Sequence, residues 1–181
     1  MDNVSKNLMI SHSPQVIGQL LDAAAADFLQ ALENFEPAEI NIIPYESSWT
    51  AGQVVEHIFI SMKAIGKVLN GATKENDRNP IEKVKPTADM FLNFTTKFKS
   101  SQSLEPSDDK QVKGVLVENL KVLFGNLTTI AFHHDLTQIC TSFKLPVLGE
   151  FTKVEWLYFC VFHSTRHAQQ LKNIREHLNQ L

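Results

Sequence analysis

Four long stretches of the chain place apolar residues three or four positions apart, which is the spacing of a helix with one buried face. They cover about residues 14–36, 50–70, 107–134 and 152–178. The first follows Ser13-Pro14, a capping residue and a proline at the first helical position, and Pro37 follows its end. The second ends at Asn70-Gly71, where glycine commonly terminates a helix. The pattern therefore predicts four long helices.

Two of these helices begin with the paired polar residues of a capping box. Thr50 precedes Gln53 by three positions, and Thr152 precedes Glu155 by the same spacing. In such a box each side chain bonds to the backbone N–H of the other residue. The third helix is expected to start near residues 107–109, because two of these three are acidic and suit the positive end of the helix dipole.

Residues 72–106 form a long connection between the second and third helices, with prolines at positions 80, 86 and 106. Within it, Thr87–Lys99 carries phenylalanines on one face and is predicted as a short helix. A connection of this length lets the third helix run parallel to the second. Strands are expected to be few or absent, with Asn41–Ile43 as a brief extended candidate. The predicted fold class is all-α, a four-helix bundle with a long crossover between helices 2 and 3.

The chain has 181 residues, of which 43% are hydrophobic and 20% charged, as in ordinary globular proteins. This length predicts a single domain over residues 1–181. The net charge is −3 and no segment is dense in lysine and arginine, so no nucleic acid partner is expected. No stretch approaches the roughly 20 apolar residues of a membrane span, and residues 1–13 lack the apolar core of a signal peptide. Cys140 and Cys160 do not indicate a disulfide framework, which favours a cytoplasmic location.

Three histidines are candidates for a metal site. His163 and His167 are four residues apart in the last helix, so their side chains share one face, about 6 Å apart at Cβ. The rest of that face is mainly apolar and is expected to face the core. His57 occupies the core-facing stripe of the second helix. Buried imidazoles need partners for their ring nitrogens, and one divalent metal ion bound by all three would supply them.

Three neutral imidazoles leave a coordination position open for water or a small-molecule substrate, as in catalytic zinc sites. Zinc suits this ligand set best, although imidazole also binds nickel, iron, copper or manganese. Each histidine also has a simpler interpretation, as a hydrogen-bonded core residue or a surface residue, and this alternative stays open.

Other residues share faces with these histidines. Gln53 and Gln170 each lie one turn from a histidine, where they could bond to the ligands, line a pocket or lie at a helix rim. Cys160 could close the site as a fourth ligand, but we favour a small core residue, since cysteine packs readily as one. The adjacent histidines His133 and His134 could approach the site from the end of the third helix.

These residues, taken in order, resemble the DinB/YfiT-like superfamily of metal-dependent proteins. The first matching motif runs from Trp49 through the capped helix start to His57. The second consists of Pro146, Gly149, Thr152, His163 and His167, followed by Gln169 and Gln170. The resemblance covers about residues 15–176.

The resemblance implies an up-down-down-up bundle whose metal ligands are His57, His163 and His167. It also implies a homodimer and a thiol-dependent S-transferase or isomerase with a low-molecular-weight thiol as co-substrate. Chemically, an open metal position can bind and deprotonate a thiol. The alternatives are a non-catalytic metal- or ligand-binding module and an interaction bundle whose histidines are only hydrogen-bonded.

Overall fold

The computed structural model describes residues 10–96 and 98–180. Its long helices are α1 (Pro14–Glu33), α2 (Ala51–Leu69), α4 (Lys113–His133) and α5 (Lys153–Leu178). The shorter elements are α3 (Val84–Phe91), the 3-10 turn η2 (Gln102–Leu104), β1 (Thr73–Lys74) and β2 (Ile139–Cys140). Most of the N-terminal segment considered above for a signal peptide, residues 1–9, lies outside the described residues.

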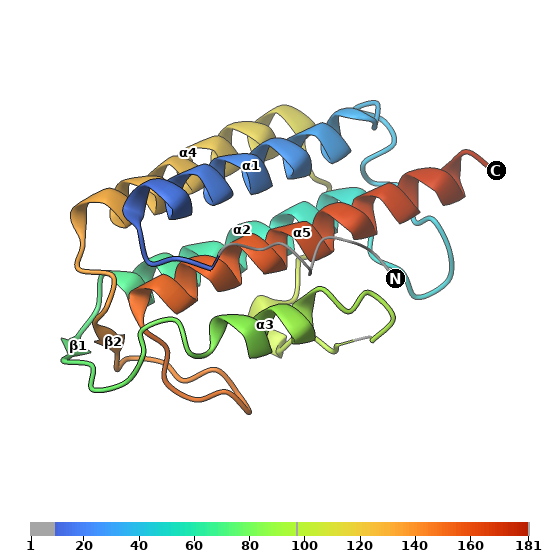
Figure 1. Ribbon diagram of the computed structural model, residues 1–181. Helices are drawn as coiled ribbons and strands as arrows, with labels where there is room; N and C mark the ends of the chain where they lie inside the picture. Colours follow the sequence, from blue (N-terminus) through green and yellow to red (C-terminus); the bar gives the residue numbers. More distant parts are fainter. Residues whose placement is uncertain (1–9, 97, 181) are drawn as a thin grey trace.

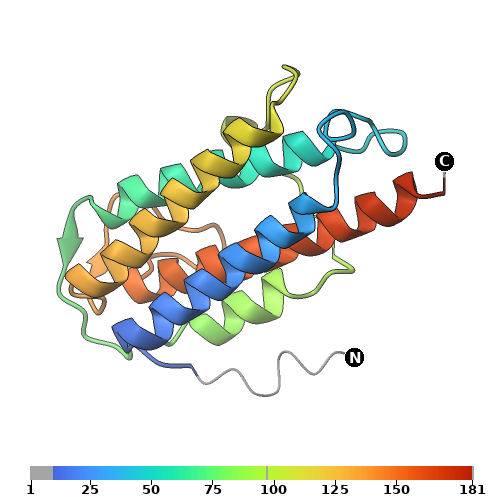
Figure 2. The same ribbon diagram turned by 90° about the horizontal axis from the view of Figure 1, so that it is seen from above.

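The four long helices form a bundle in which α1 and α5 run in one direction and α2 and α4 run in the other (Figure 1). Helices α1 and α2 each pack against both α4 and α5, so these two helices occupy opposite corners of the bundle (Figure 2). The predicted up-down-down-up bundle is confirmed, together with the crossover that makes α2 and α4 parallel. Helix α3 lies within this crossover and packs against α5.

Both predicted capping boxes are present. The Thr50 hydroxyl accepts from the Gln53 N–H at 3.1 Å, and the Gln53 side chain accepts from the Thr50 N–H at 3.0 Å. Thr152 and Glu155 form the same two bonds at 3.2 and 2.9 Å. Each box satisfies two N–H groups that have no partner within the helix. The boxes therefore fix the starts of the two helices that carry the candidate histidines.

Helix α4 begins at Lys113, later than the predicted start at residues 107–109. Ser107, together with Gln111 after it, bonds to α2 instead of capping a helix. The Ser107 N–H and the Gln111 side-chain amide both donate to the Glu56 carboxylate, at 3.0 and 2.9 Å. These bonds hold the end of the crossover against α2 in a non-helical conformation.

Helix α3 covers Val84–Phe91 and not the predicted Thr87–Lys99. The chain turns soon after Phe91, because Asn93 Oδ1 accepts from the Thr95 N–H at 3.1 Å. Such a side-chain bond to the nearby backbone competes with the helical ladder.

The two short strands were not predicted. They pair antiparallel, with Thr73 opposite Cys140, and join the start of the crossover to the α4–α5 connection. The predicted extended piece, Asn41–Ile43, is not part of a strand.

Helices α4 and α5 differ in burial. Residues 153–164 at the start of α5 are all buried, whereas α4 exposes Val115, Val122 and Phe132.

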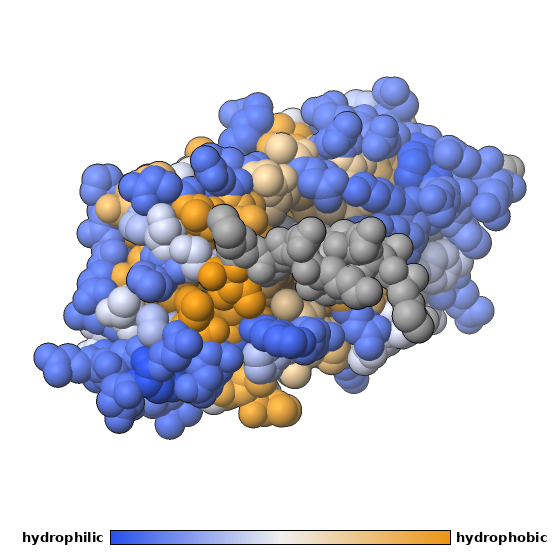
Figure 3. All heavy atoms as spheres, viewed as in Figure 1, coloured by the Kyte–Doolittle hydropathy of each residue, from blue (hydrophilic) through white to orange (hydrophobic). Residues whose placement is uncertain are grey.

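Contrary to the expectation above, α4 is long and apolar enough to cross a membrane, the one such helix among the described residues. A core helix of a bundle passes the same test, and α4 packs against α1 and α2. Apolar residues also surface between hydrophilic ones on the face seen in Figure 3.

Candidate metal centre

Three histidines from two antiparallel helices meet inside the bundle. His57 comes from the second turn of α2, and His163 and His167 come from the middle of α5. His163 Nε2 lies 3.3 Å from His57 Nε2 and 3.0 Å from His167 Nε2. The three residues are 5%, 6% and 8% exposed in sequence order, and their ligand atoms lie within 4.8 Å of one another. The structure therefore brings together the three histidines singled out in the sequence.

The outward ring nitrogens of two histidines face fixed acceptors. His57 Nδ1 lies 2.8 Å from the Leu104 carbonyl oxygen, and His167 Nδ1 lies 2.7 Å from Gln170 Oε1. Because both partners accept hydrogen bonds, each Nδ1 carries the proton of a neutral ring. The Nε2 atoms of these two rings then present lone pairs to the centre of the cluster.

These lone pairs cannot all be satisfied within the cluster. His163 Nε2 carries at most one proton, which can bond to only one of its two neighbours. In that case His163 Nδ1, buried and without a partner among the described residues, is an unpaired acceptor. Such an atom costs about 1–3 kcal/mol. A cation at the point where the Nε2 atoms converge would accept all three lone pairs, as in known zinc sites.

Burial keeps the three rings neutral. Loss of solvent, together with repulsion from the neighbouring imidazoles, lowers the pKa of His167 to about 3 and the pKa of His163 well below its ordinary value. Burial also lowers the pKa of His57, although its bond to Leu104 opposes this. Neutral imidazole is the form that binds a metal ion, so the cluster is in its metal-binding form at neutral pH.

Aromatic residues surround the cluster. The Trp49 ring centroid lies 5.1 Å from that of His57. The Phe159 and Phe91 centroids lie 5.1 and 5.7 Å from that of His163. These rings exclude water, and electrostatic interactions are stronger in such surroundings than in solvent.

Arg166 joins α5 to the segment after α3. Its guanidinium donates to the backbone carbonyls of residues 91, 93 and 96. These bonds hold the end of α3, and with it Phe91, against His163.

Cys160 is not among the converging ligands. In the part of the chain that the structure describes, the cluster consists of the three histidines. The Cys160 side chain is fully buried, and burial raises the pKa of its thiol well above the ordinary value. Because thiolate is the form that binds metal, this placement favours a packed core residue over a fourth ligand.

The two glutamines occupy different positions. Gln170 bonds directly to His167. The Gln53 side chain bonds to the Thr50 N–H and, at 3.1 Å, to the Ser107 carbonyl. Gln53 therefore holds the crossover segment, and among the described residues it bonds to no histidine.

The adjacent histidines at the end of α4 lie elsewhere. His134 Nδ1 lies 2.9 Å from Lys153 Nζ in the first turn of α5, ten residues before His163. This corresponds to about 15 Å along the helix. His133 is exposed, and neither residue belongs to the cluster.

Local sequence patterns indicate neither the Leu104 carbonyl as a partner of His57 nor the bonds of the Glu56 carboxylate to the crossover. A backbone carbonyl has no sequence signature. Glu56 immediately precedes His57, but its partner Ser107 is 51 residues away, and no local pattern links the two.

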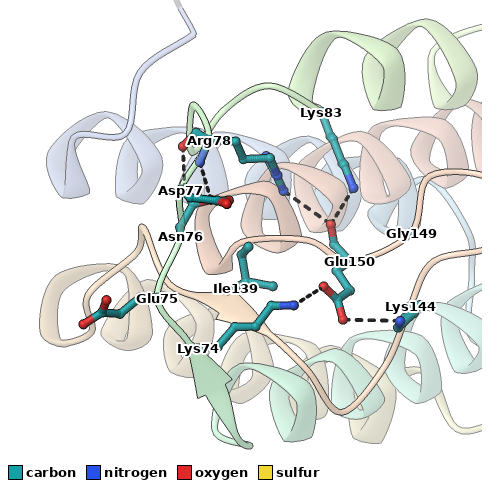
Figure 4. A pocket seen from close by; sticks show the side chains of 10 residues that line it. All are labelled: Lys74, Glu75, Asn76, Asp77, Arg78, Lys83, Ile139, Lys144, Gly149 and Glu150. Atoms are coloured by element: carbon teal, nitrogen blue, oxygen red, sulfur yellow. Dashed lines mark hydrogen bonds and ion pairs between the residues drawn. The ribbon is translucent and has the colours of Figure 1, made fainter.

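A cleft of about 660 Å³ lies apart from the histidines, at the β1–α3 and β2–α5 connections (Figure 4). Its lining residues are Lys74, Glu75, Asn76, Asp77, Arg78, Lys83, Ile139, Lys144, Gly149 and Glu150. Lys74 and Lys144 both pair with Glu150, at 2.6 and 3.3 Å. The cleft is thus crossed by ion pairs, and the three histidines are not among its lining residues.

The fold and the site define an up-down-down-up α-helical bundle with three inward histidines on its second and last long helices. The family model of the DinB superfamily matches residues 20–171. The chain belongs to the DinB superfamily.

Two Bacillus subtilis proteins are similar over most of the chain. The uncharacterised protein YuaE of strain 168 is 24% identical over 164 residues, which cover 87% of this chain and 96% of YuaE. The solved structure of YfiT matches with a TM-score of 0.60 and 15% identity, covering 96% of this chain and 91% of that one. YfiT is described as a probable metal-dependent hydrolase with an unusual four-helix bundle topology. At this identity the likeness demonstrates a shared fold.

Proposed function

We propose that this protein binds one divalent metal ion through the Nε2 atoms of His57, His163 and His167 and is a metal-dependent enzyme. The observation that carries the proposal is the convergence of three Nε2 atoms at 3.0 and 3.3 Å in a buried cluster. Hydrogen bonds alone leave part of this cluster unsatisfied, whereas a cation would accept all three Nε2 lone pairs. Zinc is the metal we expect, because three nitrogen ligands and an open position suit it best.

The surrounding residues orient the ligands and exclude water. The Leu104 carbonyl and Gln170 fix the two outer rings with Nε2 inward, and such outer partners commonly raise metal affinity. Trp49 and Phe91 shield the cluster from solvent. A bound divalent ion with an open position lowers the pKa of a water or thiol ligand.

We propose a thiol-dependent transfer or isomerisation of a small molecule as the reaction, supported by the motif resemblance from Trp49 to His167. Hydrolysis is the second candidate, favoured by the description of YfiT. Both reactions need a deprotonated nucleophile beside an open coordination position. They differ in one requirement, since only the first consumes a thiol.

Elemental analysis of untagged protein tests the metal site. We expect about one ion per chain in the wild type after incubation with zinc, and loss of that ion in His163→Ala, since two ligands remain. His134→Ala is the matched control, because that histidine is outside the cluster and should leave the metal content unchanged. Cys160→Ala should also retain the metal.

Two outcomes would contradict the proposal. Little or no metal in the wild type, with zinc or nickel, excludes the metal site. A loss in Cys160→Ala equal to that in His163→Ala indicates a closed site without an open position. The zinc-loaded protein is then assayed with an electrophile in the presence and absence of a thiol, and with esters alone, to separate the two reactions.

A further inference from the structure

Two polar side chains near the start of α2 bind the same distant segment of the crossover. Gln53 Nε2 donates to the Ser107 carbonyl at 3.1 Å. The Glu56 carboxylate accepts from the Ser107 N–H at 3.0 Å and from Gln111 Nε2 at 2.9 Å. Ser107 Oγ lies 3.1 Å from Glu56 Oε1 and adds a further bond. Glu56 is therefore the central acceptor of this contact.

The surface of α2 is shaped to receive this segment. A Cβ atom at Gly52 would lie 2.9 Å from Gln111 Cβ, closer than carbon atoms approach without displacement. Glycine at this position therefore allows the crossover to lie directly on the first turn of α2. The segment itself is irregular, since η2 ends at Leu104 and α4 begins at Lys113. Its position depends on bonds to other elements, among which those to Glu56 are charge-assisted and strong.

This segment also supplies the acceptor for a candidate metal ligand. The Leu104 carbonyl, three residues before Ser107, lies 2.8 Å from His57 Nδ1. That bond places the proton on Nδ1 and leaves the Nε2 lone pair for a metal ion. Glu56 and His57 are neighbours on α2, so one short stretch of helix both holds the segment and uses its carbonyl.

We propose that Glu56 is a positioning residue for metal binding: it anchors the crossover through Ser107, so that the Leu104 carbonyl keeps His57 in the tautomer with a free Nε2. This inference rests on the proposed metal site. Glu56 itself bonds to Ser107 and Gln111, and it is not among the converging ligand atoms. It acts through the backbone of the crossover.

Zinc affinity, measured by competition with a chelator, gives the first test. We expect Glu56→Ala to weaken zinc binding by about 10- to 100-fold, the range for losing an outer partner of a ligand. Glu56→Gln retains an acceptor oxygen and should fall between the wild type and Glu56→Ala. Glu118→Ala is the matched control, because that glutamate is exposed on α4 and pairs with Lys121 at the surface.

The tautomer of His57 in metal-free protein gives the second test, by long-range proton–nitrogen NMR. The wild type should have the proton on Nδ1, whereas Glu56→Ala should have a mixture of tautomers. A general loss of stability would not produce this change in a folded sample. Circular dichroism of each variant verifies that the helices remain.

The outcomes separate this inference from the proposed function. A wild type that binds no zinc contradicts the metal site, while the tautomer measurement still tests the role of Glu56. Zinc binding by the wild type with equal affinity and tautomer in Glu56→Ala overturns the inference alone. An effect of Glu118→Ala as large as that of Glu56→Ala would also overturn it.

Discussion

The histidine cluster and the charged cleft of Figure 4 are two polar regions of one bundle with opposite hydrogen-bonding states. In the cleft, each cation has a partner within the chain, as when Lys83 Nζ donates to the carbonyls of Leu148 and Glu150 at 2.6 and 2.7 Å. In the cluster, three Nε2 atoms face one another and can share at most one proton. The protein itself satisfies the cations of the cleft, but it does not satisfy the Nε2 atoms of the cluster.

Beside the cleft, Glu155 illustrates a polar group that is satisfied entirely within the fold. It is fully buried and accepts two bonds from Arg78, at 2.7 and 2.6 Å. It also accepts from the backbone N–H groups of Lys83 and Thr152, at 2.8 and 2.9 Å. These bonds tie the segment before α3 to the first turn of α5. A set of charges that is complete in this way stabilises local structure and needs no ligand.

The contrast separates structural from functional polar groups better than polarity or cavity volume does. The cleft is open and charged, yet its three lysines and Arg78 already have partners among the described residues. The cluster is nearly closed to solvent, but the lone pairs of its Nε2 atoms point to one place, and the cluster has too few protons to satisfy them. Buried lone pairs that converge from three residues without enough donors are uncommon in folded proteins, and this arrangement favours the proposed metal-binding role.

The largest expected effect is a loss of stability of the metal-free protein in acid. The pKa of His167, about 3, and that of His163 are depressed in the folded state, so the unfolded chain binds protons first. The contribution of the two neutral rings to the free energy of unfolding is complete above the pKa of the unfolded chain, near 6.5. It is lost as the pH falls toward the pKa values of the folded state. At about 1.4 kcal/mol per pH unit, His167 alone removes roughly 3 kcal/mol at pH 4.5, and His163 adds to this loss in the same direction.

Urea unfolding at pH 7.5 and pH 4.5 measures this effect. The variant carrying His163→Leu and His167→Leu should show a pH dependence smaller by the combined loss from the two rings, because carboxylates contribute equally to both proteins. Parallel curves for the two proteins would mean that the rings are not responsible.

The next largest effect is expected in the cleft. Arg78→Ala leaves the buried Glu155 carboxylate without its charged partner, and breaking a buried pair costs about 3–5 kcal/mol. Lys74→Ala is the control, because its pair with Glu150 is half exposed and such pairs contribute at most about 1 kcal/mol. Urea unfolding at neutral pH compares the two variants. Equal losses would remove the distinction between the buried and the exposed pair.

The fold could be predicted where the determining contacts are local. The capping boxes at Thr50 and Thr152 each depend on residues three positions apart, and both were found. The common face of His163 and His167 follows from helix geometry in the same way. The apolar stripes of α2 and α5 placed their histidines inward, which was sufficient to bring the residues together once the bundle formed.

The prediction failed where partners are distant in sequence. Acidic residues at 107–109 indicated a helix start, but Ser107 bonds instead to Glu56, 51 residues earlier. The pairing of β1 with β2 joins residues 67 positions apart, Thr73 and Cys140. The acceptor of His57 is a backbone carbonyl, which any residue type provides. Local pattern therefore gave the elements and the ligand faces, and tertiary contacts decided the rest.

The smallest predicted effect tests the difference between the cluster and the cleft most directly. Removing a polar side chain should lower the stability of the protein in the cleft and raise it in the metal-free cluster. In His163→Leu, an apolar side chain of similar size takes the place of a buried ring whose Nδ1 has no partner among the described residues. Without metal the variant loses the unpaired Nδ1 and gains apolar burial, but one neighbouring Nε2 also loses its donor, so the free energy of unfolding at pH 7.5 should rise by at most about 1 kcal/mol. With saturating zinc the order should reverse, because only the wild type gains from binding.

His134→Leu is the matched control, since His134 already has a partner in Lys153 and its loss should not stabilise the protein. Urea unfolding of the wild type and of one variant, each with a chelator and with zinc, gives the four free energies of unfolding needed for each comparison. If His163→Leu is less stable than the wild type without metal, the histidine cluster is satisfied on its own, and the difference between the two polar regions disappears. If the variant is more stable without metal and less stable with it, the cluster is maintained at a cost in stability that only ligand binding explains.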